Sequence, residues 1–121
     1  MGDGLDITVR RERGVVIAAV TGDVDISTVA TLRECLLELA DGGGTLIVDL
    51  NRVAFIDSAG LGALVGAARR AAAHGGSLHA VCARRPTRRL LWLTGVDRRI
   101  PLAATVDGAP MSLAAHRDAR G

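Results

Sequence analysis

Hydrophobic and polar residues alternate along the start of the chain, as expected for strands with one buried face. Leu5, Ile7 and Val9 are separated by polar residues, which is the period-two pattern of a half-buried strand. After the turn "RERG", the apolar run "VVIAAV" at 15–20 indicates a second strand. The two segments together predict a hairpin that opens the domain.

Three later stretches carry apolar residues at the three- and four-residue spacing of an amphipathic helix. In the first, Ser27 or Thr28 can cap a helix that ends at the glycines of "DGGG", since glycine accepts the left-handed C-cap conformation. The second stops at "HGG", and the third has Pro86 in its first turn and ends at Gly95. The predicted apolar stripes are Val29, Leu32, Leu36 and Leu39; then Leu61, Leu64, Val65 and Ala68; then Leu90, Leu91 and Trp92.

Short apolar runs between these helices predict three more strands, at 45–50, 77–82 and 99–105. The continuous run "TLIVDL" at 45–50 is typical of a strand in a sheet that is covered on both faces. Strands that alternate with helices imply crossover connections, and therefore mostly parallel pairing.

We therefore predict an α/β fold: a small mixed, mostly parallel β-sheet with the N-terminal hairpin at one edge and one layer of helices packed on it. A single domain is expected over residues 1–121, with its core at about 5–104. The remaining 105–121 would hold a weak terminal helix that starts at Pro110, followed by a polar tail.

Composition disfavours several classes of function. Only 2% of the 121 residues are aromatic, so the chain has little with which to stack sugars or bases, and its formal net charge of +2 does not suggest direct nucleic-acid binding. Cys35 and Cys82 lack metal-ligand spacing and are predicted to be buried free thiols in a reducing compartment. Without a secretory leader or a long apolar run, the sequence predicts a cytoplasmic protein with no membrane, metal or cofactor.

Catalytic motifs are not supported by the sequence. The segment "FIDSAG" is not the G-x-S-x-G elbow of a hydrolase, because Ile56 stands where that motif needs glycine. An esterase-like use of Ser58 would need a histidine within hydrogen-bonding distance, and no motif links His74, His79 or His116 to it. The prediction is a protein that is not an enzyme.

Arginines cluster in "ARRPTRRLL", where Arg84 and Arg88, like Arg85 and Arg89, stand four residues apart at a helix start. Like charges at this spacing disfavour a helix slightly. We favour a solvated face as their explanation. A patch for an acidic partner is the functional alternative, and binding of nucleic acid is weaker still because no aromatic residues are interleaved.

The stretch "AFIDSAGLGALV" at 54–65 places a serine where a helix begins. The common explanation is that Asp57 or Ser58 caps this helix by accepting hydrogen bonds from its free N–H groups. Two glycines, Gly60 and Gly62, exceed what capping needs, since each weakens a helix by about 1 kcal/mol relative to alanine. We expect these small residues to leave the first turn uncovered, so that another surface can approach Ser58.

This motif, in "VDLNRVAFIDSAGLGALV" with "TGDVDISTVATL" upstream, resembles the anti-sigma factor antagonists of the STAS (sulfate transporter and anti-sigma antagonist) domain family. The likeness runs from Leu5 to about Ala104. It implies that Ser58 is the serine that is phosphorylated, that Asp57 is the acid before it, and that Asp25 helps to engage the partner. The partner-binding residues implied are Asp25, Asp57, Ser58, Ala59, Gly60, Leu61 and Gly62.

The resemblance also implies a mechanism of partner switching. The unmodified protein would bind an anti-sigma factor that is itself a serine kinase and so free a sigma factor; a PP2C-type phosphatase would remove the phosphate. Ala59 stands where many members of the family have a second hydroxyl residue, which leaves one candidate hydroxyl. The alternative is a STAS interaction subunit of a lipid-transport or stress-signalling complex that has no phosphorylation switch.

Overall fold

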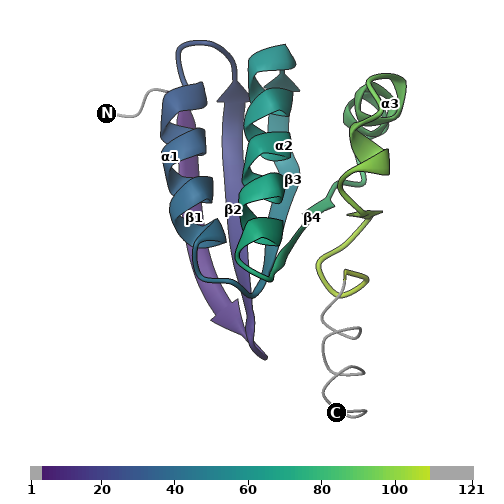
Figure 1. Ribbon diagram of the computed structural model, residues 1–121. Helices are drawn as coiled ribbons and strands as arrows, with labels where there is room; N and C mark the ends of the chain where they lie inside the picture. Colours follow the sequence, from purple (N-terminus) through teal and green to yellow (C-terminus); the bar gives the residue numbers. More distant parts are fainter. Residues whose placement is uncertain (1–3, 110–121) are drawn as a thin grey trace.

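The computed structural model describes residues 4–109 and shows a five-stranded sheet with two long helices side by side on one face (Figure 1). The strands lie in chain order across the sheet; β1 is antiparallel to β2, and the later neighbours are parallel. This arrangement confirms the predicted fold class. The elements are β1 (Leu5–Glu12), β2 (Val15–Val24), α1 (Val29–Ala40), β3 (Thr45–Ile56), α2 (Ser58–Ala73), β4 (Ser77–Val81), α3 (Arg85–Leu93), the 3-10 helix η1 (Val96–Arg98) and β5 (Leu102–Ala103).

The central strand β3 is buried on both faces. Leu46, Val48 and Leu50 join the main core with the buried residues of α1 and α2. Ile47, which points the opposite way in the alternation of a strand, joins a second cluster on the other face with Val15, Ile17, Val81 and Ala109. The continuous apolar run at 45–50 therefore predicted its environment correctly.

Four predicted strands differ in extent from the observed ones. β2 continues from the predicted 15–20 to Val24, and β4 ends at Val81, one residue before the predicted end. β3 continues past residue 50 to Ile56, because Val53 and Ile56 are buried and the strand keeps its pairing with β2 through two register shifts. The polar residues "NR" at 51–52 concealed this continuation. The last strand, β5, holds only Leu102 and Ala103 of the predicted 99–105. The terminal helix predicted from Pro110 lies outside the described residues.

Small residues decide which face of α2 meets the core. Val65 and Ala68 of the predicted stripe are half-buried, whereas Ala63, Ala67 and Ala71 are buried. Alanines on the inner face let the helix pack closely against the sheet. Leu61 and Leu64 of the predicted stripe are buried as expected, so the stripe was correct in part and missed the alanines. The prediction for α3 was wrong at Trp92, which is exposed.

The expected cap of α1 and one of the two expected thiols also need correction. Thr28 precedes α1 but makes no capping hydrogen bond with its side chain; its hydroxyl donates instead to the carbonyl oxygen of Asp23, at 2.8 Å. Both cysteines are free; Cys82 is buried as predicted, but Cys35 is only half-buried on α1. Desolvation, and after it the charge of Glu38, raises the pKa of the Cys35 thiol.

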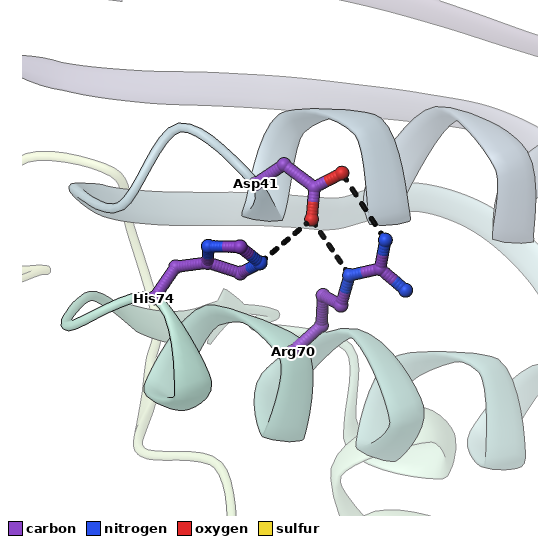
Figure 2. A network of polar contacts seen from close by, with 3 residues as sticks. All are labelled: Asp41, Arg70 and His74. Atoms are coloured by element: carbon purple, nitrogen blue, oxygen red, sulfur yellow. Dashed lines mark hydrogen bonds and ion pairs between the residues drawn. The ribbon is translucent and has the colours of Figure 1, made fainter.

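At their C-terminal ends, α1 and α2 are joined by a cluster of three charged or titratable side chains (Figure 2). The Asp41 carboxylate accepts from Arg70 Nε at 2.6 Å and from Arg70 Nη2 at 3.3 Å, and His74 Nε2 lies 3.1 Å from the same carboxylate. Asp41 follows the last residue of α1, and His74 follows the last residue of α2. This contact holds the two helix ends together at the edge where β3 begins. In residues 4–109, no helix combines the length and the apolar character that crossing a membrane requires.

Candidate functional site

The site predicted around Ser58 lies at the edge of the sheet where β2 and β3 end. Val24 and Ile56, the last residues of these parallel strands, are paired in register. The next residue, Asp57, donates its backbone N–H to the carbonyl oxygen of Val24 at 3.1 Å. The turn that leads to α1 and the start of α2 are therefore neighbours. In parallel α/β sheets this carboxyl edge is where ligands and partners commonly bind.

Asp57 is the residue that caps α2. Its backbone is extended, and its Oδ1 accepts hydrogen bonds from the N–H groups of Ala59 at 3.0 Å and Gly60 at 3.1 Å. The sequence left open whether Asp57 or Ser58 performs this task, and the structure assigns it to the aspartate.

Ser58 is the first residue of α2 and is exposed. Because Asp57 supplies the cap, the serine hydroxyl is not needed for it. Within residues 4–109 the Ser58 hydroxyl makes no hydrogen bond. Its oxygen is accessible and unengaged at the point where the helix begins.

Asp25 has a structural task of its own beside this serine. Its Oδ1 accepts from the Ser27 hydroxyl at 2.6 Å, from Ser27 N–H at 2.9 Å and from Thr28 N–H at 3.2 Å. These hydrogen bonds, the one from the Ser27 hydroxyl first, hold the pKa of Asp25 below its ordinary value. The carboxylate therefore organises the turn before α1. Within residues 4–109, every side-chain hydrogen bond of Asp25 goes to Oδ1, and none goes to the second oxygen, Oδ2.

The small residues of "SAGLG" do not all serve the purpose expected of them. Gly60 is buried, and a Cβ there would lie 2.5 Å from Val24 Cγ1 and 2.7 Å from Ile56 Cγ1. It lets α2 pack on the strand ends, so the expectation that it leaves the surface open was wrong. Leu61 is also buried in the core, and Ala59 is half-buried. Among the four residues that follow Ser58, only Gly62 is exposed, with open space where its Cβ would be.

Two apolar side chains at this edge were missed in the sequence. Ile26, directly after Asp25, is 83% exposed, and Phe55, the residue before the last residue of β3, is 52% exposed. A large apolar residue between polar neighbours in a turn, as in "VDIST", is a signal that could have identified Ile26. Both side chains are available for apolar contact with a partner.

The histidines of the described chain are engaged away from Ser58. His74 follows the last residue of α2, about 24 Å of helix from Ser58 at 1.5 Å per residue, and it contacts Asp41. His79 Nε2 lies 3.1 Å from Ser77 Oγ on β4. Neither is placed to act as a base for Ser58, and His116 lies outside the described residues. No group of three or more His, Cys, Asp or Glu between residues 4 and 109 could hold a metal ion.

Comparison with known proteins identifies the family. The family model described as "STAS domain" matches residues 6–109, nearly all of the chain. The chain belongs to the STAS domain family. The resemblance noted in the sequence is thereby confirmed.

Two curated proteins and one solved structure to which this chain is similar are named anti-sigma factor antagonists. The chain is 30% identical over 104 residues to the anti-sigma-B factor antagonist of Bacillus subtilis, covering 86% of this chain and 95% of that one. It is 31% identical over 108 residues to the anti-sigma-F factor antagonist RsfB of Mycobacterium tuberculosis, covering 88% of each. A crystal structure of an anti-sigma factor antagonist from Mycobacterium paratuberculosis matches with a TM-score of 0.81 and 29% identity over 98% of both chains.

Proposed function

We propose that this STAS domain is an anti-sigma factor antagonist controlled by phosphorylation of Ser58. In the unphosphorylated form it binds an anti-sigma factor that is also a serine kinase, and so frees a sigma factor. Phosphorylation of Ser58 ends this binding, and a PP2C-type phosphatase restores it. The names of the curated relatives support the first part. The observation that carries the switch is the exposed, unengaged hydroxyl of Ser58 beside a helix cap that does not need it.

Ser58 is distinguished from the other described serines by the freedom of its hydroxyl. Ser27 is also exposed and lies in the neighbouring turn, but its hydroxyl donates to Asp25 at 2.6 Å. Ser77 Oγ lies 3.1 Å from a ring nitrogen of His79. A kinase would have to break a contact at either of these serines, whereas Ser58 presents its oxygen directly.

Phosphorylation would change charge at the surface without disturbing the fold. A phosphoserine adds about −1.5 to −2 charge at neutral pH. The N–H groups of Ala59 and Gly60, which could have bound it, are already held by Asp57. The phosphate would therefore lie beside the Asp57 carboxylate and would stay hydrated as long as the protein is not bound to a partner.

Docking of the phosphorylated form would require this charge to lose its water. The penalty for burying an ion is several kcal/mol, and about 1.4 kcal/mol is tenfold in affinity. A fraction of that penalty is enough to release the partner. The exposed Ile26 and Phe55 would contribute apolar contacts in the unphosphorylated complex.

The test uses the purified protein, the anti-sigma factor encoded in the same genome and ATP, with the phosphorylated residue located by mass spectrometry. We expect phosphate on Ser58 in the wild type and in Ser27→Ala, and none in Ser58→Ala. In a binding titration, Ser58→Ala should hold the anti-sigma factor even with ATP present, and Ser58→Asp should bind at least about tenfold more weakly.

Ser27→Ala is the matched control, since it removes an exposed hydroxyl from the adjacent turn and leaves Ser58 intact. Phosphate found at another residue, with Ser58 unmodified, would refute the assignment. Equal binding of Ser58→Asp and the wild type would refute the switch. Absence of binding to any anti-sigma factor of that genome would favour a STAS subunit that has another partner.

A further inference from the structure

The arginines that follow β4 have no role in the switch proposed above. Six arginines and one aspartate lie between residues 83 and 100. Arg84 Nη1 donates to the carbonyl oxygen of Val53 at 3.0 Å, and Arg88 Nη1 donates to that of Cys82 at 2.7 Å, so these two fasten α3 to the sheet. Within residues 4–109, the side chains of four others make no hydrogen bond or ion pair: Arg85, Arg89, Arg98 and Arg99.

Two large apolar side chains share one side of α3 with two of these arginines. Trp92 is 64% exposed and Leu93 is 60% exposed. Arg85, Arg89 and the Trp92–Leu93 pair follow at intervals of three and four residues, which places them on one face of a helix. We call these four residues the α3 face. Tryptophan and arginine are the residue types that most often dominate the binding energy of protein interfaces.

Between residues 4 and 109, no acidic side chain forms an ion pair with the arginines of the α3 face. Cations four residues apart repel, and cations at a helix N-terminus oppose the helix dipole. In this stretch, Asp97 is the single acid. Residues 110–121 hold two arginines and one aspartate, so they bring no surplus of acid either. An acidic binding partner would remove this unfavourable charge density.

A hollow beside the segment that follows η1 has the same chemistry. Its volume is about 280 Å³, and it is lined by Val65, Ala68, Arg69, Ala72 and Arg99. Three small apolar side chains with two arginines suit an apolar side chain that has an acidic neighbour. The α3 face and this hollow therefore favour the same kind of occupant.

We propose that the α3 face and this hollow bind an acidic segment of a protein partner that inserts a large apolar side chain, independently of the phosphorylation state of Ser58. A membrane fits less well, because α3 has nine residues and only two large apolar side chains exposed, whereas interfacial helices bury a continuous apolar face. Nucleic acid fits less well because Trp92 is the single aromatic residue of this region.

Trp92 makes the proposal directly measurable, since it is the only tryptophan of the chain. The probe is a synthetic peptide in which glutamates surround a leucine and a phenylalanine, titrated against the full chain while tryptophan emission is recorded. We expect a saturable blue shift as Trp92 becomes covered, and no shift with the same peptide carrying lysine in place of glutamate.

Paired charge reversals separate this surface from general attraction. Arg85→Glu with Arg89→Glu should weaken peptide binding at least about tenfold. Arg11→Glu with Arg33→Glu changes the net charge equally, on exposed positions of β1 and α1, and should change the affinity less than about twofold. Arg85→Gln with Arg89→Gln, checked for folding by circular dichroism, should give an intermediate loss. Ser58→Glu should bind the peptide as the wild type does.

The proposal is overturned if the peptide does not bind, or if the Arg11 and Arg33 reversals weaken it as much as the α3 reversals. It is also overturned if phosphatidylserine vesicles or duplex DNA shift the emission and the peptide does not. Loss of peptide binding in Ser58→Glu would show that the two surfaces are one. None of these outcomes depends on an anti-sigma factor or on phosphorylation, so they stand apart from the test of the proposed function.

Discussion

The two ends of the helix pair α1 and α2 use their aspartates in opposite ways. At the C-terminal ends, Asp41 bonds across the gap to Arg70 and His74 of the other helix (Figure 2). At the N-terminal ends, the carboxylates of Asp25 and Asp57 accept hydrogen bonds only from backbone N–H groups or hydroxyls within the next three residues. The aspartate at the C-terminal ends joins α1 to α2, whereas the aspartates at the N-terminal ends each stabilise the start of their own helix.

The difference explains how the side chains at the N-terminal ends of α1 and α2 can remain exposed on a small domain. Local hydrogen bonds satisfy the helix starts without drawing in neighbouring side chains, so Ser58 and Ile26 remain exposed between them. The start of α2 is held in place by close packing of Gly60 against the ends of β2 and β3. Substitutions at the two ends should therefore differ in the size of their effects and in their response to salt.

The largest effect is expected at Gly60. Gly60→Ala should lower the free energy of unfolding by about 1–3 kcal/mol, because the added Cβ meets Val24 and Ile56 at distances no real contact tolerates. Gly62→Ala is the matched control: it lies in the same helix with open space around it, and should stabilise by about 1 kcal/mol. Urea denaturation of the two variants measures the contrast. Equal effects at both glycines would show that Val24 and Ile56 can move to accommodate the added Cβ, and would contradict the prediction.

Removal of the α2 cap should have the next largest effect. Asp57→Ala should lower the free energy of unfolding by about 1 kcal/mol, because the N–H groups of Ala59 and Gly60 lose their acceptor. Ser58→Ala should change it by less than about 0.5 kcal/mol, since its hydroxyl is unbonded. Asp57→Asn keeps a capping oxygen and should restore most of the loss. A larger loss in Ser58→Ala than in Asp57→Ala would contradict the assignment of the cap.

The sequence was sufficient to predict the order of elements but not their exact extent. The apolar run at 45–50 and the glycine at position 95 each reflect local rules, and each appears in the structure as predicted. In the first strand, Leu5 and Ile7 are half-buried as the alternation predicted, but Val9 is exposed, so the prediction was wrong at that position. The continuation of β3 depends on pairing with β2, which the polar residues 51–52 hide. The inner face of α2 depends on how closely it approaches the sheet, which favours alanine over larger residues.

Ser58 could be singled out from its motif, but the tasks of its neighbours could not. Asp57 and Ser58 are both common capping residues, so the sequence cannot decide between them. The backbone conformation, which is extended at Asp57, decides which of the two caps the helix. Gly60 is buried by the ends of β2 and β3, so its burial cannot be predicted until these strands are placed. The exposure of Trp92 can be predicted only once it is known which side of α3 meets the sheet.

The smallest effect is expected from the pH and salt dependence of the Asp41 cluster. The hydrogen bond and charge of Arg70, with the charge of His74, hold the pKa of Asp41 below its ordinary value. A carboxyl group with a lowered pKa stabilises the folded state fully above its unfolded value of about 3.9, and this contribution is lost as the pH falls through the folded value. Asp41→Asn should therefore flatten the acid limb of the stability curve between about pH 5 and pH 2, measured by urea denaturation at each pH.

Salt distinguishes the two ends of the helix pair in the same experiment. Asp41 bonds to charged side chains that are exposed, so salt at about 1 M should remove most of its contribution. Asp25 also has a lowered pKa, but its bonds go to the Ser27 hydroxyl and to backbone N–H groups. The acid-limb difference between Asp25→Asn and the wild type should therefore persist at high salt, while that of Asp41→Asn disappears. If both differences disappear together, the contrast between a cross-helix ion pair and a local turn does not hold.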